Sequence, residues 1–151
     1  RRKAVSRRKG SAAAQAGKPE ILSAEQVAQQ FAEGTTTVMV RNIPNRYSCE
    51  EFLCEIIAHG FEGKFDFFYL PIDFATKRNR GYCFLNFQDA YWAQRFALAF
   101  HNRRLERYST KKILEIAPAA TQGLEQNLKG GNSRVKNQWF RPMVFGVEGS
   151  D

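Results

Sequence analysis

Cysteine and histidine are scarce in this 151-residue sequence, which limits the kinds of site that it can build. It contains three cysteines and two histidines. Cys49, Cys54 and Cys83 each stand among apolar residues, which favours small core side chains in a reducing compartment over disulfides. Neither His59 nor His101 has a partner at zinc-ligand spacing, so we expect no metal site.

Motifs of catalysis and of membrane insertion are also lacking. There is no glycine-rich phosphate loop and no nucleophile beside a base in motif form, so we expect neither a cofactor nor an enzyme. No run of about 18 apolar residues is present, and no charged-then-apolar signal segment opens the chain. We expect a monomer without membrane contact, located inside the cell in the nucleus or the cytoplasm.

Positive charge is concentrated at one end of the chain. The net charge is +8, but residues 1–19 alone hold seven Lys or Arg and no acidic residue. The rest of the chain is nearly neutral, with 16 basic against 15 acidic side chains. We expect residues 1–22 to be a disordered tail, acting either as a nucleic-acid patch or import signal or as a solvated linker.

The order of the hydrophobic patterns predicts an α+β fold. Capping boxes at Ser23 and Ser48 open two helices, and Asp89 caps a third. After the first helix the order is strand, helix, strand, strand, helix, strand. This order specifies a ferredoxin-like split βαβ sandwich, with a four-stranded antiparallel sheet and two helices on one face. The predicted segments are helices over 23–34, 48–60 and 89–102 and strands over 35–43, 63–74, 78–87 and 111–119.

Alternation in the third predicted strand, "RGYCFLNF", assigns its side chains to two faces of the sheet. Cys83, Leu85 and Phe87 suit the face under the helices, so Tyr82 and Phe84 point to the open face. Two neighbouring aromatic side chains in water are unfavourable unless something stacks on them or covers them. The pattern therefore predicts a binding surface on the open face.

The same strand resembles the octamer motif of the RNA recognition motif domain. "VMVRNI", residues 38–43, resembles the companion hexamer, with Met39 at a position that is usually aromatic. Met39 still offers a soft apolar surface to a base. In the octamer, the matching positions are Arg80, Gly81, Tyr82, Phe84 and Phe87, and the conservative departures are Cys83 and Leu85.

Longer stretches are similar to the Mei-two-like proteins. "TTVMVRNIPNRY", "FDFFYLPIDF", "RGYCFLNF" and "RPMVF" carry this resemblance over roughly residues 35–145. It implies an RNA-binding domain at the C-terminal end of a larger regulator of meiosis or development. The chain then divides into the tail, an N-terminal helix over 23–34, an RNA recognition motif over 35–119 and a C-terminal extension over 120–151.

The proposed RNA-binding residues fall into an aromatic platform and a basic rim. On the platform, single-stranded bases stack on Tyr82 and Phe84. Arginine and lysine side chains in and beside the loop "ATKRN" are expected to hold phosphates or bases, and Asn42 shapes the turn after the first strand. The full set is Met39, Arg41, Asn42, Phe67, Tyr69, Lys77, Arg78, Arg80, Tyr82 and Phe84.

A protein-binding module is the alternative, with the open face covered by the chain's own C-terminal extension. "TQGLEQNLK" predicts a short helix with an apolar stripe of Leu124 and Leu128 for docking. Trp139 and Phe140 in "WFRPMVF" are expected to pack against the domain rather than on RNA. Docking on the helical side would make the extension a scaffold, and docking across the sheet would make it a gate. Partner proteins could also bind the helical face at the same time as RNA.

Overall fold

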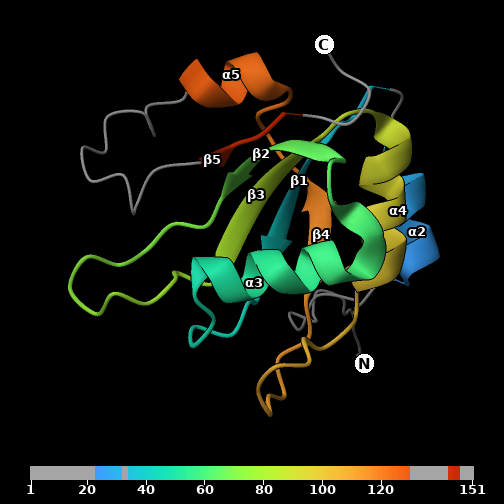
Figure 1. Cartoon of the computed structure of the whole chain (residues 1–151). Coiled ribbons are helices and arrows are strands. Elements are labelled where there is room, and N and C mark those ends of the chain that lie inside the picture. Colours follow the sequence, from blue (N-terminus) through green and yellow to red (C-terminus); the bar gives the residue numbers. More distant parts are fainter. Residues whose placement is uncertain (1–22, 32–33, 130–142, 147–151) are drawn as a thin grey trace, which may run out of the picture.

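The computed structural model describes residues 23–31, 34–129 and 143–146. The predicted basic tail and the anchors Trp139 and Phe140 lie outside the described residues. Figure 1 shows a layer of helices packed on a single sheet. The described helices are α2 (Ala24–Gln29), α3 (Cys49–Ile56), α4 (Ala90–Phe100) and α5 (Leu124–Lys129), and a π-helical turn, η1 (Ile57–Phe61), extends α3.

The strands form one antiparallel sheet in the order β4-β1-β3-β2-β5. Strand β3 is central, β1 and β2 flank it, and every pairing in the ladder is antiparallel. The ferredoxin-like prediction is confirmed, but the sheet has a fifth strand that the pattern did not predict. The strands are β1 (Thr37–Arg41), β2 (Phe65–Tyr69), β3 (Tyr82–Phe87), β4 (Glu115–Pro118) and β5 (Met143–Val144).

Local capping explains where the helices begin. Ser23 and Ser48 each accept a hydrogen bond from a backbone N–H three residues on, and Gln26 and Glu51 complete the two predicted capping boxes. The Asp89 carboxylate accepts from the Trp92 N–H and starts α4. The first helix is shorter than predicted, because Gln30 already caps it.

Aromatic rings fill the space between the helices and the sheet. Phe61, at the end of η1, packs edge-on against Phe96 of α4, with ring centroids 5.5 Å apart, and also contacts Phe87 of β3. Gly60 adopts φ +96°, which lets the chain turn Phe61 inward, and a residue with a side chain would be strained there. Each such buried ring contributes about 1.5–3 kcal/mol through its removal from water. This core fixes the helices on one face of the sheet.

No helix among the described residues combines the length and apolar character that crossing a membrane requires.

Candidate nucleic-acid interface

The register of the ladder places the predicted platform residues side by side on the face away from the helices. Met39 of β1 is paired with Phe84 of β3, which is paired with Tyr69 of β2. In the next row Arg41 is paired with Tyr82. Side chains directly opposite each other in a ladder have Cβ atoms about 4.5–5.5 Å apart, so these five residues form a continuous surface. We call them the platform.

The platform is partly exposed and is apolar at its centre. Tyr82 and Phe84 are half-buried, and their rings meet edge-on at 5.8 Å with an interplanar angle of 79°. Met39 and Tyr69 are half-buried as well, whereas Arg41 is exposed. Rings held in this way offer faces to flat ligands without a large loss of side-chain entropy on binding.

The Tyr69 side chain is partly buried, and its hydroxyl is affected by Tyr82 and Arg80. Burial raises the pKa of the Tyr69 hydroxyl, the neighbouring Tyr82 raises it further, and the positive charge of Arg80 opposes both. Tyr69 is therefore neutral at physiological pH and can donate a hydrogen bond.

The loop between β2 and β3 forms an ordered basic rim. The Asp73 carboxylate accepts hydrogen bonds from the Thr76 hydroxyl at 2.8 Å and from the Thr76 N–H at 3.3 Å. These bonds lower the pKa of Asp73, so the turn keeps its negative anchor at neutral pH. Asp73 also lies 3.9 Å from the Arg80 guanidinium. Lys77, Arg78 and Arg80 are exposed along this loop.

Two asparagines hold the turns at this end of the sheet. Asn42 has φ +67°, and its side-chain amide donates to the Ile113 carbonyl at 2.9 Å. This geometry accounts for the predicted role of Asn42 in shaping the turn after β1. Asn79 is buried, and its amide donates to the carbonyls of Pro44 and Tyr47. The rim loop is therefore tied to the β1–α3 connection.

The opposite end of the open face is closed by the segment that leads into α5. The Gln122 side chain accepts from the backbone N–H groups of Thr36 and Thr37, both at 2.9 Å, and donates to the Thr37 carbonyl. The Thr37 hydroxyl accepts from the Gly123 N–H and donates to Asn86. We call this set of polar contacts the α5 lock. Figure 1 shows α5 at this end of the sheet, away from the rim loop.

Phe67 requires a correction, because it was predicted to contact RNA. The ladder pairs it with Asn86 and Val144, on the predicted side of the sheet, but its side chain is 0% exposed. It lies in the row closed by the α5 lock and outside the core cluster under the helices. A base could stack on Phe67 only if its cover were removed.

The docking of α5 also differs from the prediction. Leu128, one of two leucines expected to dock, is 40% exposed, whereas Asn127 is only 6% exposed. The Asn127 amide donates to the Gly123 carbonyl at 2.7 Å and to the Thr37 hydroxyl at 3.3 Å. The helix is therefore held by buried polar groups, each of which has a hydrogen-bond partner.

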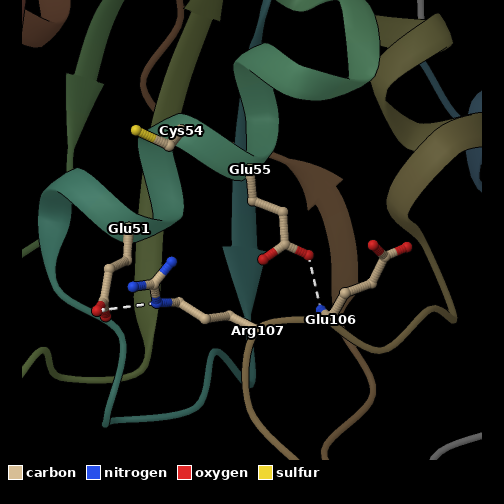
Figure 2. A pocket seen from close by; sticks show the side chains of 5 residues that line it. All are labelled: Glu51, Cys54, Glu55, Glu106 and Arg107. Atoms are coloured by element: carbon tan, nitrogen blue, oxygen red, sulfur yellow. Dashed lines mark hydrogen bonds and ion pairs between the residues drawn. The ribbon is translucent and has the colours of Figure 1, made fainter.

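A shallow hollow lies on the helical side of the molecule, remote from the platform (Figure 2). Arg107 approaches Glu51 at 3.0 Å, and the Glu106 N–H donates to Glu55 at 2.7 Å. Tyr47 donates to the other oxygen of Glu55. The acidic residues of α3 thus bind the α4–β4 loop of the same chain. Among the described residues, no group of three or more His, Cys, Asp or Glu could hold a metal ion.

Glu51 should make the stability of the fold depend on acid pH. The Ser48 N–H, the Tyr108 hydroxyl and Arg107 lower the pKa of Glu51 below its usual range. Its stabilising contribution is therefore present above the unfolded-state pKa, about 4.3, and is lost as the pH falls through the lower folded-state value. Glu51→Gln should unfold more easily than the wild type at pH 7, and the difference should shrink below about pH 4. Urea unfolding at several pH values measures this.

Glu50→Gln is the matched control for that experiment, because Glu50 is on α3 but does not line the hollow. A stability difference for Glu51→Gln that stays constant from neutral pH to acid pH would contradict the assignment.

The sequence analysis missed several residues on the open face of the sheet and at its α5 end. Glu115 of β4 is exposed and is paired with Arg41, so a carboxylate lies beside the platform. Its alternation with buried Leu114 and Ile116 would have assigned it to the open face. Gln122, before α5, and Asn127, within it, had no such signal, because polar residues in loops and short helices normally face water.

Comparison with known proteins agrees with this geometry. The family model described as RNA recognition motif 2 matches residues 35–129. Protein MEI2-like 3 of Oryza sativa subsp. japonica is 35% identical over 120 residues, covering 78% of this chain and 12% of the relative. Protein MEI2-like 5 of the same organism is 38% identical over 113 residues, covering 73% and 14%. Protein terminal ear1 of Zea mays is 37% identical over 127 residues, covering 73% and 19%.

The chain spans less than a fifth of the length of these curated relatives. Among solved structures, the Sxl-lethal protein/RNA complex is 22% identical, with a TM-score of 0.48, and the match covers 58% of this chain and 51% of that one.

Proposed function

This chain belongs to the RNA recognition motif 2 family, as a Mei2-like member, and we propose that it binds single-stranded RNA on the platform. Unpaired bases stack on Tyr82 and Phe84, with Met39 and Tyr69 beside them. Arg41 and the rim residues Lys77, Arg78 and Arg80 contact phosphates or base edges. The module binds and does not catalyse.

The observation that carries the proposal is the Tyr82–Phe84 pair. The two rings lie 5.8 Å apart on the face that the helices leave open, and both are half-exposed. Their neighbours in the ladder are Met39, Arg41 and Tyr69, so the surface is flat, apolar and edged with positive charge. Sequence-tolerant binding of single strands requires this combination of stacking rings and cations.

The rival function, a protein-binding module whose sheet is covered by its own extension, is less well supported. The α5 lock binds Thr37 and Asn86, and Phe67 in the same row is buried, while Tyr82 and Phe84 stay partly exposed. Partner proteins on the helical face remain compatible with RNA on the other face. Two acidic side chains on that face, Glu51 and Glu55, are already engaged by the α4–β4 loop.

The wider role is also part of the proposal. The relatives are named for Mei2 and for terminal ear1, and each is several times longer than this chain. We take the chain to be one RNA-binding module of a larger post-transcriptional regulator of meiosis or development, acting in the nucleus or the cytoplasm. Binding by residues 1–22 would add affinity without base preference.

The test is binding of a random single-stranded RNA pool and of a duplex RNA by the whole chain at several salt concentrations. We expect single strands to bind in preference to the duplex. Each phosphate contact contributes about 0.7 to the slope of log affinity against log salt, so removing two rim cations should flatten the slope by about 1.4. The variants are Lys77→Asn, which tolerates the φ of +64° at that position, and Arg78→Gln.

Fluorescence anisotropy measures both the preference and the slope. Arg95→Gln on α4 is the matched control, since it removes one cation from the helical side, beside Tyr91. Equal affinity for the duplex and the single strand would rule out the proposed surface. So would a salt slope that Arg95→Gln alters and the rim variants leave unchanged.

A further inference from the structure

Phe74 is an exposed aromatic residue held at the tip of an ordered hairpin. It is 55% exposed and lies between Asp73 and the basic residues of the rim. The hairpin of β2 and β3 continues past the strands, because the Asp73 N–H donates to the Arg78 carbonyl and the Arg80 N–H donates to the Pro71 carbonyl. The Lys77 N–H and ammonium donate to the carbonyls of Asp73 and Phe74. These bonds fix the backbone on both sides of Phe74.

The hairpin continues the platform rather than leaving it. Arg80 is exposed two residues before Tyr82, while Asn79, the residue before Arg80, is buried and bound to the carbonyls of Pro44 and Tyr47. The Arg80 guanidinium lies 3.9 Å from Asp73, the residue before Phe74. The exposed residues Arg80 and Phe74 therefore lie on the hairpin that continues from the end of β3 where Tyr82 begins the platform. Figure 1 shows this loop projecting beyond the ends of β2 and β3.

Along β3, the described part of the chain leaves one end of the platform open to a strand of RNA, the end at the rim. At the other end the Thr37–Asn86 row is sealed by Gln122 and Gly123, and Phe67 is buried. The α5 end also places a carboxylate near the surface, since Asp66 accepts from Asn86 at 2.8 Å. The rim end instead has the exposed cations Lys77, Arg78 and Arg80, which match a phosphate backbone.

We infer that Phe74 is a further stacking site for RNA, occupied by a base that has left the platform at the rim end. The inference rests on the proposed function and adds the direction in which the bound RNA extends. The base lies on the Phe74 ring while the rim cations hold the adjoining phosphates. The order of the hairpin means that the ring is presented before RNA arrives, so little entropy is lost when it binds.

The test compares Phe74→Ala with the wild type on a short RNA of about three nucleotides and on a longer one of about eight. We expect the loss of Phe74 to weaken binding of the longer RNA by about five- to tenfold and to leave the short RNA unaffected. Tyr91→Ala is the matched control, because Tyr91 is 59% exposed on α4, on the helical side. A fluorescent adenine analogue can be placed at each position of the longer RNA in turn. Its emission in complex with Phe74→Ala should differ from that with the wild type at a single position, near one end of the RNA.

The outcomes separate this inference from the proposed function. If Tyr82→Ala weakens both RNAs and Phe74→Ala weakens neither, the Phe74 site is wrong and the platform stands. An equal loss for short and long RNA in Phe74→Ala also overturns the inference, since Phe74 would then act on the platform itself. If the wild type binds neither RNA, the proposed function fails, and the Phe74 site fails with it.

Discussion

Tyr82→Ala should weaken the binding of single-stranded RNA by roughly 1–3 kcal/mol, which is about 5- to 150-fold in the dissociation constant. The reason is the loss of one stacking surface at the centre of the platform. Phe84→Ala should have an effect of the same size, because Phe84 occupies the middle of the row between Met39 and Tyr69. Isothermal titration calorimetry with a strand chosen from the random pool measures both.

The interpretation of these variants depends on an intact fold. Tyr82 and Phe84 are half-exposed and lie outside the core cluster under the helices, so their removal should leave the thermal midpoint nearly unchanged. Phe67→Ala provides the contrast: Phe67 is fully buried, and its loss should cost about 3–5 kcal/mol of stability. Unchanged RNA affinity in a folded Tyr82→Ala protein would mean that the open face is not the RNA surface.

Alternation along β1 and β3 was enough to predict which side chains face the helices and which face the other way. Val38, Val40, Cys83 and Leu85 are buried under the helices, and Met39, Tyr82 and Phe84 take the other side. The period of two in a strand is set by the backbone alone, so it can be read without knowledge of the neighbours. The capping boxes at Ser23 and Ser48 are equally local, and both were predicted correctly.

Strand β2 shows where this reasoning stops. Strict alternation would place Phe65 on the side of Phe67, but the ladder shifts between them and Phe65 joins the core. Phe67 keeps the predicted side, yet its side chain is fully buried. Exposure is a property of the whole fold, and no periodicity in β2 encodes what will cover one of its residues.

The α5 segment could not be predicted for a related reason. Its apolar stripe suggested docking through leucines, but Gln122 and Asn127 bind β1 through polar groups. Hydrophobic patterning identifies faces that avoid water, whereas a buried amide is recognised only when its partner is known. The rim loop was predictable only in part. Its cations were evident in the sequence, but its ordered conformation depends on the Asp73–Thr76 hydrogen bonds.

The α5 lock should contribute substantially to the stability of the sheet, and Gln122→Ala tests it. The substitution removes the acceptor that the Thr36 and Thr37 N–H groups share and the donor to the Thr37 carbonyl. Part-buried backbone groups that lose a partner cost about 1–3 kcal/mol. We expect the free energy of unfolding to fall by roughly that amount in urea titrations. Leu128→Ala, on the exposed side of α5, is the matched control and should change stability little.

The RNA affinity of Gln122→Ala separates two roles for the extension. If the lock is a scaffold, RNA affinity should remain at the wild-type level while stability falls, because the platform lies in the neighbouring rows of the ladder. If the lock is a gate, the variant should bind RNA more tightly, since the Thr37–Asn86–Phe67 row becomes available for another base. The α5 segment docks at one end of the sheet face, the placement that was expected of a gate, but the contacts favour a scaffold. Thr37 and Asn86 are buried polar residues that bond to each other and to α5, and they are not apolar surfaces ready for stacking. A Gln122→Ala protein with wild-type stability and wild-type affinity would show that these hydrogen bonds do not hold α5 on the sheet.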